Sequence, residues 1–113
     1  MRRGEIWWVD FPAPEGSEPG YPRPAIIISS DQFNVTAIRT VVVVIVTTNL
    51  RLAEAPGNVE LAPRVGGLRE RSVANVSQIA TVNKARLRRR MGTVPAPIFS
   101  QIETGVRLSL ALS

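Results

Sequence analysis

The hydrophobic positions of the chain fall mostly into short runs separated by proline and glycine, a pattern typical of a small β-protein. Strands are predicted at residues 6–11, 25–29, 39–47, 59–61, 71–77 (extended by or paired with 78–82) and 91–94. Residues 41–46 are six consecutive β-branched residues with no polar alternation. An unalternating run of this kind predicts a strand that is covered on both faces.

One amphipathic helix is predicted after Pro95, because Pro97 suits a first helical turn and apolar residues follow it at i, i+4 spacing. That predicted stripe consists of Ile98, Ile102, Val106 and Leu110. Gly105 costs about 1 kcal/mol relative to alanine inside a helix, a cost that close packing would explain. Short strands and one terminal helix predict a single domain over residues 1–113. Its predicted fold class is mostly β, a small curved antiparallel sheet or partial barrel.

The connecting segments carry their own signals. Residues 12–22 contain four prolines and two glycines, which predicts a long irregular loop of the kind that more often carries function than not. A second loop is expected after Thr48-Asn49. Single helical turns are expected at residues 31–34 and at 83–87, where Asn83 can cap the turn.

Composition excludes several chemistries, because the chain has no cysteine and no histidine. Disulfides, zinc–thiolate sites, cysteine nucleophiles and Ser-His-Asp triads are therefore ruled out. The net charge is +5, and thirteen of the fourteen basic residues are arginine. Arginine favours contact with phosphate or carboxylate, so the charge indicates either a nucleic-acid or acidic-protein partner or a merely solvated basic surface.

No membrane or export segment is predicted. The longest aliphatic run, residues 41–46, is far short of the roughly 20 residues that a membrane-spanning helix needs. The first residues lack the apolar core of a signal peptide. A cytoplasmic location is therefore expected.

Three features of the sequence could together form a catalytic site. They are the loop containing Ser17 and Glu18, Arg23 at the start of a buried strand, and the polar cluster Thr47-Thr48-Asn49 at the end of the most apolar strand. Arginine and hydroxyl groups can stabilise negative charge on a phosphorus centre, and Glu18 could act as a base. RNA supplies its own nucleophile, the 2′-OH. Cleavage of RNA therefore requires neither a metal ion nor a protein nucleophile, and no cofactor is expected.

The order of several short segments adds a resemblance over nearly the whole chain. The segments are Arg3-Gly4-Glu5-Ile6-Trp7-Trp8-Val9-Asp10, Gly16-Ser17-Glu18, Arg23-Pro24-Ala25-Ile26-Ile27-Ile28-Ser29, Val44-Ile45-Val46-Thr47 and Ser72-Val73 with Gln78-Ile79. With the terminal helix, this order resembles the MazF/PemK family of toxin endoribonucleases from bacterial type II toxin–antitoxin systems.

The resemblance implies an SH3-like barrel that forms a homodimer and is inhibited by a MazE-like antitoxin. It also implies metal-independent, sequence-specific cleavage of single-stranded RNA to 2′,3′-cyclic phosphate and 5′-OH ends. The family's catalytic arginine and threonine fall on Arg23 and Thr47. The expected RNA-contacting residues are Ser17, Glu18, Asn49, Ser72 and Gln78. We expect the antitoxin to carry an acidic, flexible segment.

One position departs from the family pattern: many relatives have aspartate before the later-strand serine, where this chain has Arg71. Arg71 is expected to contact phosphate or to pair with Glu70 or another acid. The basic run 86–90 is interpreted as a solvated face or as a surface that steers RNA backbone. Trp7 and Trp8 are expected to point to opposite faces, one into the core and one into an interface or groove.

Two other functions remain open. The first alternative is a topoisomerase poison, as relatives of this fold that resemble CcdB are. That activity relies on a C-terminal tryptophan segment, whereas this chain ends Leu110-Ala111-Leu112-Ser113. The second alternative is a non-catalytic barrel that only binds RNA or an antitoxin.

Overall fold

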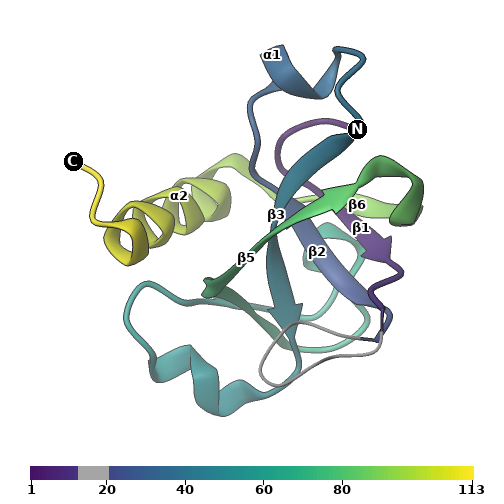
Figure 1. Cartoon of the computed structure of the whole chain (residues 1–113). Coiled ribbons are helices and arrows are strands. Elements are labelled where there is room, and N and C mark those ends of the chain that lie inside the picture. Colours follow the sequence, from purple (N-terminus) through teal and green to yellow (C-terminus); the bar gives the residue numbers. More distant parts are fainter. Residues whose placement is uncertain (13–20) are drawn as a thin grey trace.

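One curved antiparallel sheet dominates the computed structural model, which describes residues 1–12 and 21–113 (Figure 1). The strands in this part of the chain are β1 (Glu5–Val9), β2 (Arg23–Ile27), β3 (Thr40–Thr47), β4 (Val59–Leu61), β5 (Ser72–Asn83) and β6 (Leu87–Thr93). Their order in the sheet is β4-β5-β3-β2-β1-β6, and each neighbouring pair is antiparallel. The predicted mostly-β fold with a C-terminal helix is confirmed.

Short helical segments join the strands. They are α1 (Asp31–Asn34) and the 3-10 turns η1 (Leu50–Glu54), η2 (Val65–Gly67) and η3 (Lys84–Arg86). A longer helix, α2 (Ala96–Leu110), follows the last strand. The Asn83 side chain caps η3 by accepting from the backbone N–H of Ala85 at 2.8 Å, as predicted. The turn η1 was not predicted, since only a loop was expected after Asn49.

The long strand β5 gives the sheet its curl. It pairs with β3 in two stretches, and the register shifts where Val44 opposite Ile79 is followed by Ile45 opposite Asn75. A bulge of this kind bends a strand and increases its twist. Of residues 71–82, predicted as one extended or two paired segments, all but Arg71 therefore belong to one bent strand, which also pairs with β4.

The turn η2 closes the curled sheet by lying against the far edge strand, β6. Gly67 has a φ of +82°, and a Cβ atom there would overlap the backbone carbonyl of Met91. The close approach of these two segments, from opposite ends of the strand order, produces the predicted partial barrel.

The apolar run of β3 is buried on both faces, as predicted from its lack of alternation. Val44 and Val46 pack with Ile26 in a core that helix α2 covers through Ile102. Val43 and Ile45 belong to a second core on the other face. The members of that second core are Val9, Phe11, Ala25, Ile27, Val41, Val43, Ile45, Val82 and Leu87.

Helix α2 follows the predicted stripe except at its end. Ile98, Ile102 and Val106 contact the first core, whereas Leu110 is 53% exposed because the last turn projects past the sheet (Figure 1). Gly105 is buried against Gly57 in the turn before β4, and a Cβ atom at Gly105 would overlap the Gly57 carbonyl oxygen. The close packing that would explain this glycine is therefore present.

Several predicted strand boundaries were wrong. The first strand ends at Val9 rather than Phe11, the second spans Arg23–Ile27 rather than 25–29, and the last begins at Leu87 rather than Met91. The other strand ends differ from the prediction by at most one residue. The arginines at 88–90 therefore lie within a strand, where the pairing of β6 with β1 outweighs their charge. Of the helices in the described ranges, none combines the length and hydropathy needed to cross a membrane.

Candidate active site

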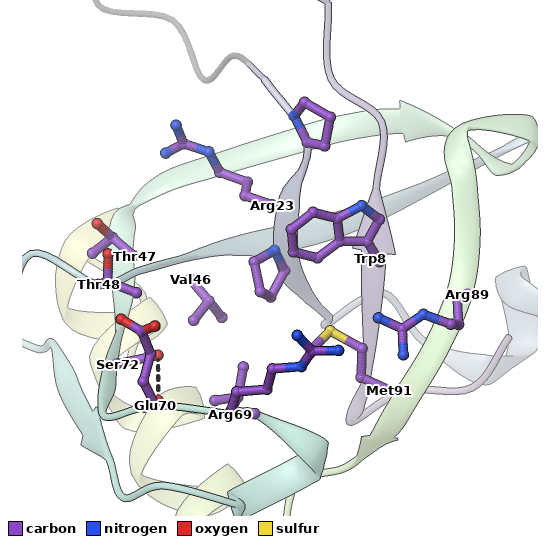
Figure 2. A pocket seen from close by; sticks show the side chains of 13 residues that line it. Trp8, Arg23, Val46, Thr47, Thr48, Arg69, Glu70, Ser72, Arg89 and Met91 are labelled. Atoms are coloured by element: carbon purple, nitrogen blue, oxygen red, sulfur yellow. Dashed lines mark hydrogen bonds between the residues drawn. The ribbon is translucent and has the colours of Figure 1, made fainter.

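A cleft of about 600 Å³ lies at one end of the sheet, where β2 begins and β3 ends (Figure 2). Strand ends and adjoining loops are where a rigid scaffold presents side chains to a ligand. The cleft is lined by Trp8, Pro22, Arg23, Pro24, Val46, Thr47, Thr48, Leu68, Arg69, Glu70, Ser72, Arg89 and Met91.

Arg23 and Thr47 come to this cleft from neighbouring strands. The register that pairs Ala25 with Ile45 places Arg23 opposite Thr47 two residues further along. Both residues line the cleft, on the same side of it in Figure 2. The two residues predicted to act together are thus brought together by the sheet itself.

The Arg23 side chain is only partly exposed, and its Nε atom is buried without a hydrogen-bond partner in the described ranges. Buried donors are normally paired, because leaving one unpaired costs about 1–3 kcal/mol. Arg23 also lines the cleft, so the described residues leave part of the hydrogen-bonding capacity of a cleft guanidinium unsatisfied.

The hydroxyl of Thr47 is held by the start of the next turn. The backbone N–H of Asn49 donates to Thr47 Oγ1 at 3.1 Å, and the Asn49 side chain in turn accepts from the backbone N–H of Arg51 at 3.3 Å. A hydroxyl that accepts one bond keeps its own hydrogen for donation, and Thr47 lines the cleft. Asn49 contacts Thr47 but does not line the cleft.

The other predicted RNA-contacting residues divide into three cases. Ser72 lines the cleft, but it is only 2% exposed and donates to the backbone carbonyl of Glu70 at 2.9 Å. Gln78 does not line the cleft; its side chain accepts from Asn75 at 3.2 Å within the bulge of β5. Ser17 and Glu18 lie outside the described residues.

Arg71, at the position that departs from the family pattern, pairs with an acid. Its Nε atom lies 3.5 Å from a carboxylate oxygen of Glu60 on the adjacent strand β4. Of the two expected pairings, the one with an acid other than Glu70 is the one observed. Arg71 is not among the residues that line the cleft.

Sequence reasoning missed Arg69, Glu70 and Met91 as cleft residues, and treated Arg89 only as part of a basic run. Arg69 and Glu70 follow the tight turn η2. Their place in the cleft depends on the packing of that turn against β6, which links segments far apart in the sequence. Arg89 pairs with Trp8 across the β1–β6 ladder, and the sequence did not show this because the predicted strand began only at Met91. Trp8 lines the cleft and Trp7 packs against the second core, so the predicted division of the two tryptophans is confirmed.

The reverse face of the β1–β6 ladder holds a buried carboxylate. Glu5 accepts from the backbone N–H of Arg2 at 2.8 Å, from Trp7 Nε1 at 2.9 Å and from Arg90 at 3.2 Å. Burial opposes ionisation of Glu5, but these hydrogen bonds outweigh it and hold the pKa of the carboxyl below its ordinary value of 4.5.

A small curled antiparallel barrel with an arginine-rich cleft is typical of proteins that bind phosphate groups or nucleic acid. Comparison with known proteins narrows this class. Residues 2–110 match the family model described as "PemK-like, MazF-like toxin of type II toxin-antitoxin system", and the chain belongs to that family. The family predicted from the sequence is thereby confirmed.

Full-length relatives support the assignment. The protein named endoribonuclease MazF6 of Mycobacterium tuberculosis is 41% identical over 112 residues, covering 99% of this chain and 98% of the relative. Endoribonuclease MazF9 of the same species is 38% identical over 116 residues, with the same two coverages.

Solved structures agree in fold. A mycobacterial endoribonuclease in complex with its cognate antitoxin superposes with a TM-score of 0.81 at 25% identity, covering 100% of this chain and 97% of that one. MazF from Deinococcus radiodurans superposes with a TM-score of 0.82 at 19% identity, covering 99% and 97%. The predicted barrel is therefore the fold of the MazF toxins.

Proposed function

We propose that this chain is the toxin of a type II toxin–antitoxin system and cleaves single-stranded RNA internally without a metal ion. The observation that carries the proposal is the meeting of Arg23 and Thr47 at one cleft, with a buried Arg23 donor left unpaired in the described part of the chain. The full-length relatives named endoribonucleases support the same activity.

The proposed reaction uses the nucleophile that RNA carries. The 2′-oxygen attacks the adjacent phosphorus, the bond from phosphorus to the 5′-oxygen breaks, and the products end in a 2′,3′-cyclic phosphate and a 5′-OH. Negative charge grows on the non-bridging oxygens in the transition state. Arg23 donates to one of them as a fixed cation, and Thr47 donates its hydroxyl to another.

Proton transfer requires groups other than arginine, because a guanidinium stays protonated in proteins. The base must take the proton from the 2′-OH, and an acid must supply one to the departing 5′-oxygen. Glu70 is the one carboxylate on the described wall of the cleft, and we assign it the role of base. Glu18, predicted from the sequence for this role, is the alternative.

We further propose that the chain works as a homodimer and is bound and inhibited by a cognate antitoxin. In support, the solved mycobacterial relative is in complex with its cognate antitoxin. We place the dimer surface at the last turn of α2 and the residues after it, where three leucines are exposed in the single chain: Leu108 is 61% exposed, Leu110 53% and Leu112 58%. The net charge of +5 suits an acidic antitoxin segment.

The test is digestion of a long unstructured RNA in EDTA. Discrete fragments with cyclic phosphate and 5′-OH ends are expected, and sequencing the 5′-OH ends gives the target. Arg23→Ala should abolish these fragments, whereas Arg107→Ala, on the exposed face of α2, should not. Intact RNA across diverse sequences would contradict the proposal. RNA binding without cleavage would then indicate a non-catalytic barrel. Loss of supercoiling in a gyrase assay would indicate a topoisomerase poison.

A further inference from the structure

Two runs of charged residues border the cleft, and in each the arginines divide in the same way. In β6, Arg88 pairs with Asp10 at 3.0 Å and Arg90 pairs with Glu5 at 3.2 Å. Arg89 lies between them, and its side chain lines the cleft instead. It has no carboxylate partner among residues 1–12 and 21–113.

The segment before β5 repeats this arrangement. Arg71 pairs with Glu60 across the β4–β5 ladder, at 3.5 Å. Arg69, two residues earlier, lines the cleft and has no ion-pair partner within the described ranges. Acids thus neutralise the arginines that face away from the cleft and leave those that face into it without partners.

Arg69 and Arg89 approach the same part of the cleft from different elements. Figure 2 shows both guanidinium groups directed into the pocket, on the side away from Arg23 and Thr47, with Trp8 and Met91 beside them. Like charges gathered in one cleft repel each other unless an anion lies between them. Two arginines turned towards a shared space therefore indicate an anion-binding position.

We infer that Arg69 and Arg89 form a second phosphate-binding position, which holds a phosphate of the RNA next to the one that is cleaved. This inference rests on the proposed function. The planar guanidinium binds phosphate with two parallel hydrogen bonds, so a pair of them fixes both the position and the orientation of the backbone. The indole of Trp8, opposite Arg89 in the ladder, offers a surface against which the intervening base stacks.

The position of this site determines what it does for the reaction. Arg69 and Arg89 bind a phosphate whose charge is the same before and during cleavage. They therefore stabilise the bound substrate and the transition state equally, which lowers KM and leaves kcat unchanged. Arg23 acts where charge develops and affects kcat. The two positions together require a substrate with at least two phosphates, so a dinucleoside monophosphate is a poor substrate.

The test compares cleft arginines with their paired neighbours on an oligonucleotide spanning the mapped cleavage site. Arg69→Ala and Arg89→Ala should each raise KM about tenfold or more with kcat retained. The matched controls Arg71→Ala and Arg88→Ala should leave both constants within about twofold. Replacing the flanking phosphate with an uncharged methylphosphonate should raise the wild-type KM equally and remove any further effect of the cleft variants.

A binding measurement separates this inference from the proposed function. The probe is a fluorescein-labelled, uncleavable 2′-O-methyl RNA 20-mer of mixed sequence, titrated at several salt concentrations. Each cleft variant should reduce the salt slope of log K by about 0.7, the value for one single-strand phosphate contact. That result supports the second position even if wild-type protein cleaves nothing.

Three outcomes would overturn the inference. The first is an unchanged salt slope and KM in the double variant Arg69→Ala/Arg89→Ala. The second is a fall in kcat that methylphosphonate substitution does not reproduce. The third is a loss of affinity for an acidic antitoxin peptide with RNA binding unaffected. Circular dichroism of each variant, together with the retained kcat, establishes that the fold is intact.

Discussion

Alanine at Gly105 tests whether packing against the Gly57 turn, rather than helix propensity, decides the stability of α2. In an exposed helix interior, glycine to alanine stabilises by about 1 kcal/mol. Here the added Cβ would overlap the carbonyl oxygen of Gly57 and lie 2.9 Å from its carbonyl carbon. The obstacle is backbone, held by a glycine with a φ of +82°, so it cannot swing aside as a flexible side chain would.

The magnitudes decide the sign of the effect. Overpacking a tight contact costs about 1–3 kcal/mol, and an overlap with backbone belongs at the upper end of that range. After the gain in helix propensity is subtracted, Gly105→Ala should lower the free energy of unfolding by about 1–2 kcal/mol. For a chain of this length that lowers Tm by about 4–8 °C.

The assay is urea unfolding followed by circular dichroism, with Thr104→Ala as the matched control. Thr104 is exposed on the same helix, so alanine there should follow propensity and raise stability by a few tenths of a kcal/mol. Since Gly105 lies outside the cleft, RNA cleavage per folded molecule should be unchanged. A Gly105→Ala protein as stable as wild type, or more stable, would refute the packing argument.

Three further predictions follow from particular side chains. The pKa of Glu5 in the folded protein lies below its ordinary value of 4.5, so ionised Glu5 stabilises the fold above pH 4.5. This stabilisation is lost as the pH falls through the lower pKa of the folded state. The free energy of unfolding should therefore fall more steeply with decreasing pH for wild type than for Glu5→Gln. Glu70→Gln should slow single-turnover cleavage by about 10²-fold or more. If it does not, and Glu18→Gln does, Glu18 is the base. Leu108→Arg should shift the protein from dimer to monomer in sedimentation velocity, and an unchanged sedimentation coefficient would contradict the dimer surface.

Much of the fold was predictable because its signals are local. The β-branched run of β3 predicts burial on both faces, and the spacing of Ile98, Ile102 and Val106 predicts the buried face of α2. The start of β6 was missed because its arginines look like a solvated segment. The acids that neutralise two of them, Glu5 and Asp10, lie about 80 residues away in the sequence.

The site was predictable only in part, for a related reason. Arg23 and Thr47 could be assigned from a resemblance, and the strand register accounts for their meeting. The role of Arg69 and Arg89 depends on which arginines have partners, and that is set by pairing between distant strands. Gln78 lies in the β5 bulge and accepts from Asn75, and no local sequence pattern marks that bulge. Its predicted contact with RNA stays a prediction.

The most direct test of the central claim is a double-mutant cycle on Arg23 and Thr47 by single-turnover cleavage of the mapped RNA site. If both side chains act on one phosphate, Arg23→Ala should cost about 10²–10³-fold in rate. The Arg23→Ala/Thr47→Val protein should then be much less impaired than the product of the two single effects, by a coupling of about 1 kcal/mol or more. Two effects that multiply independently, or Arg23→Ala cleavage at the wild-type rate, would contradict the account.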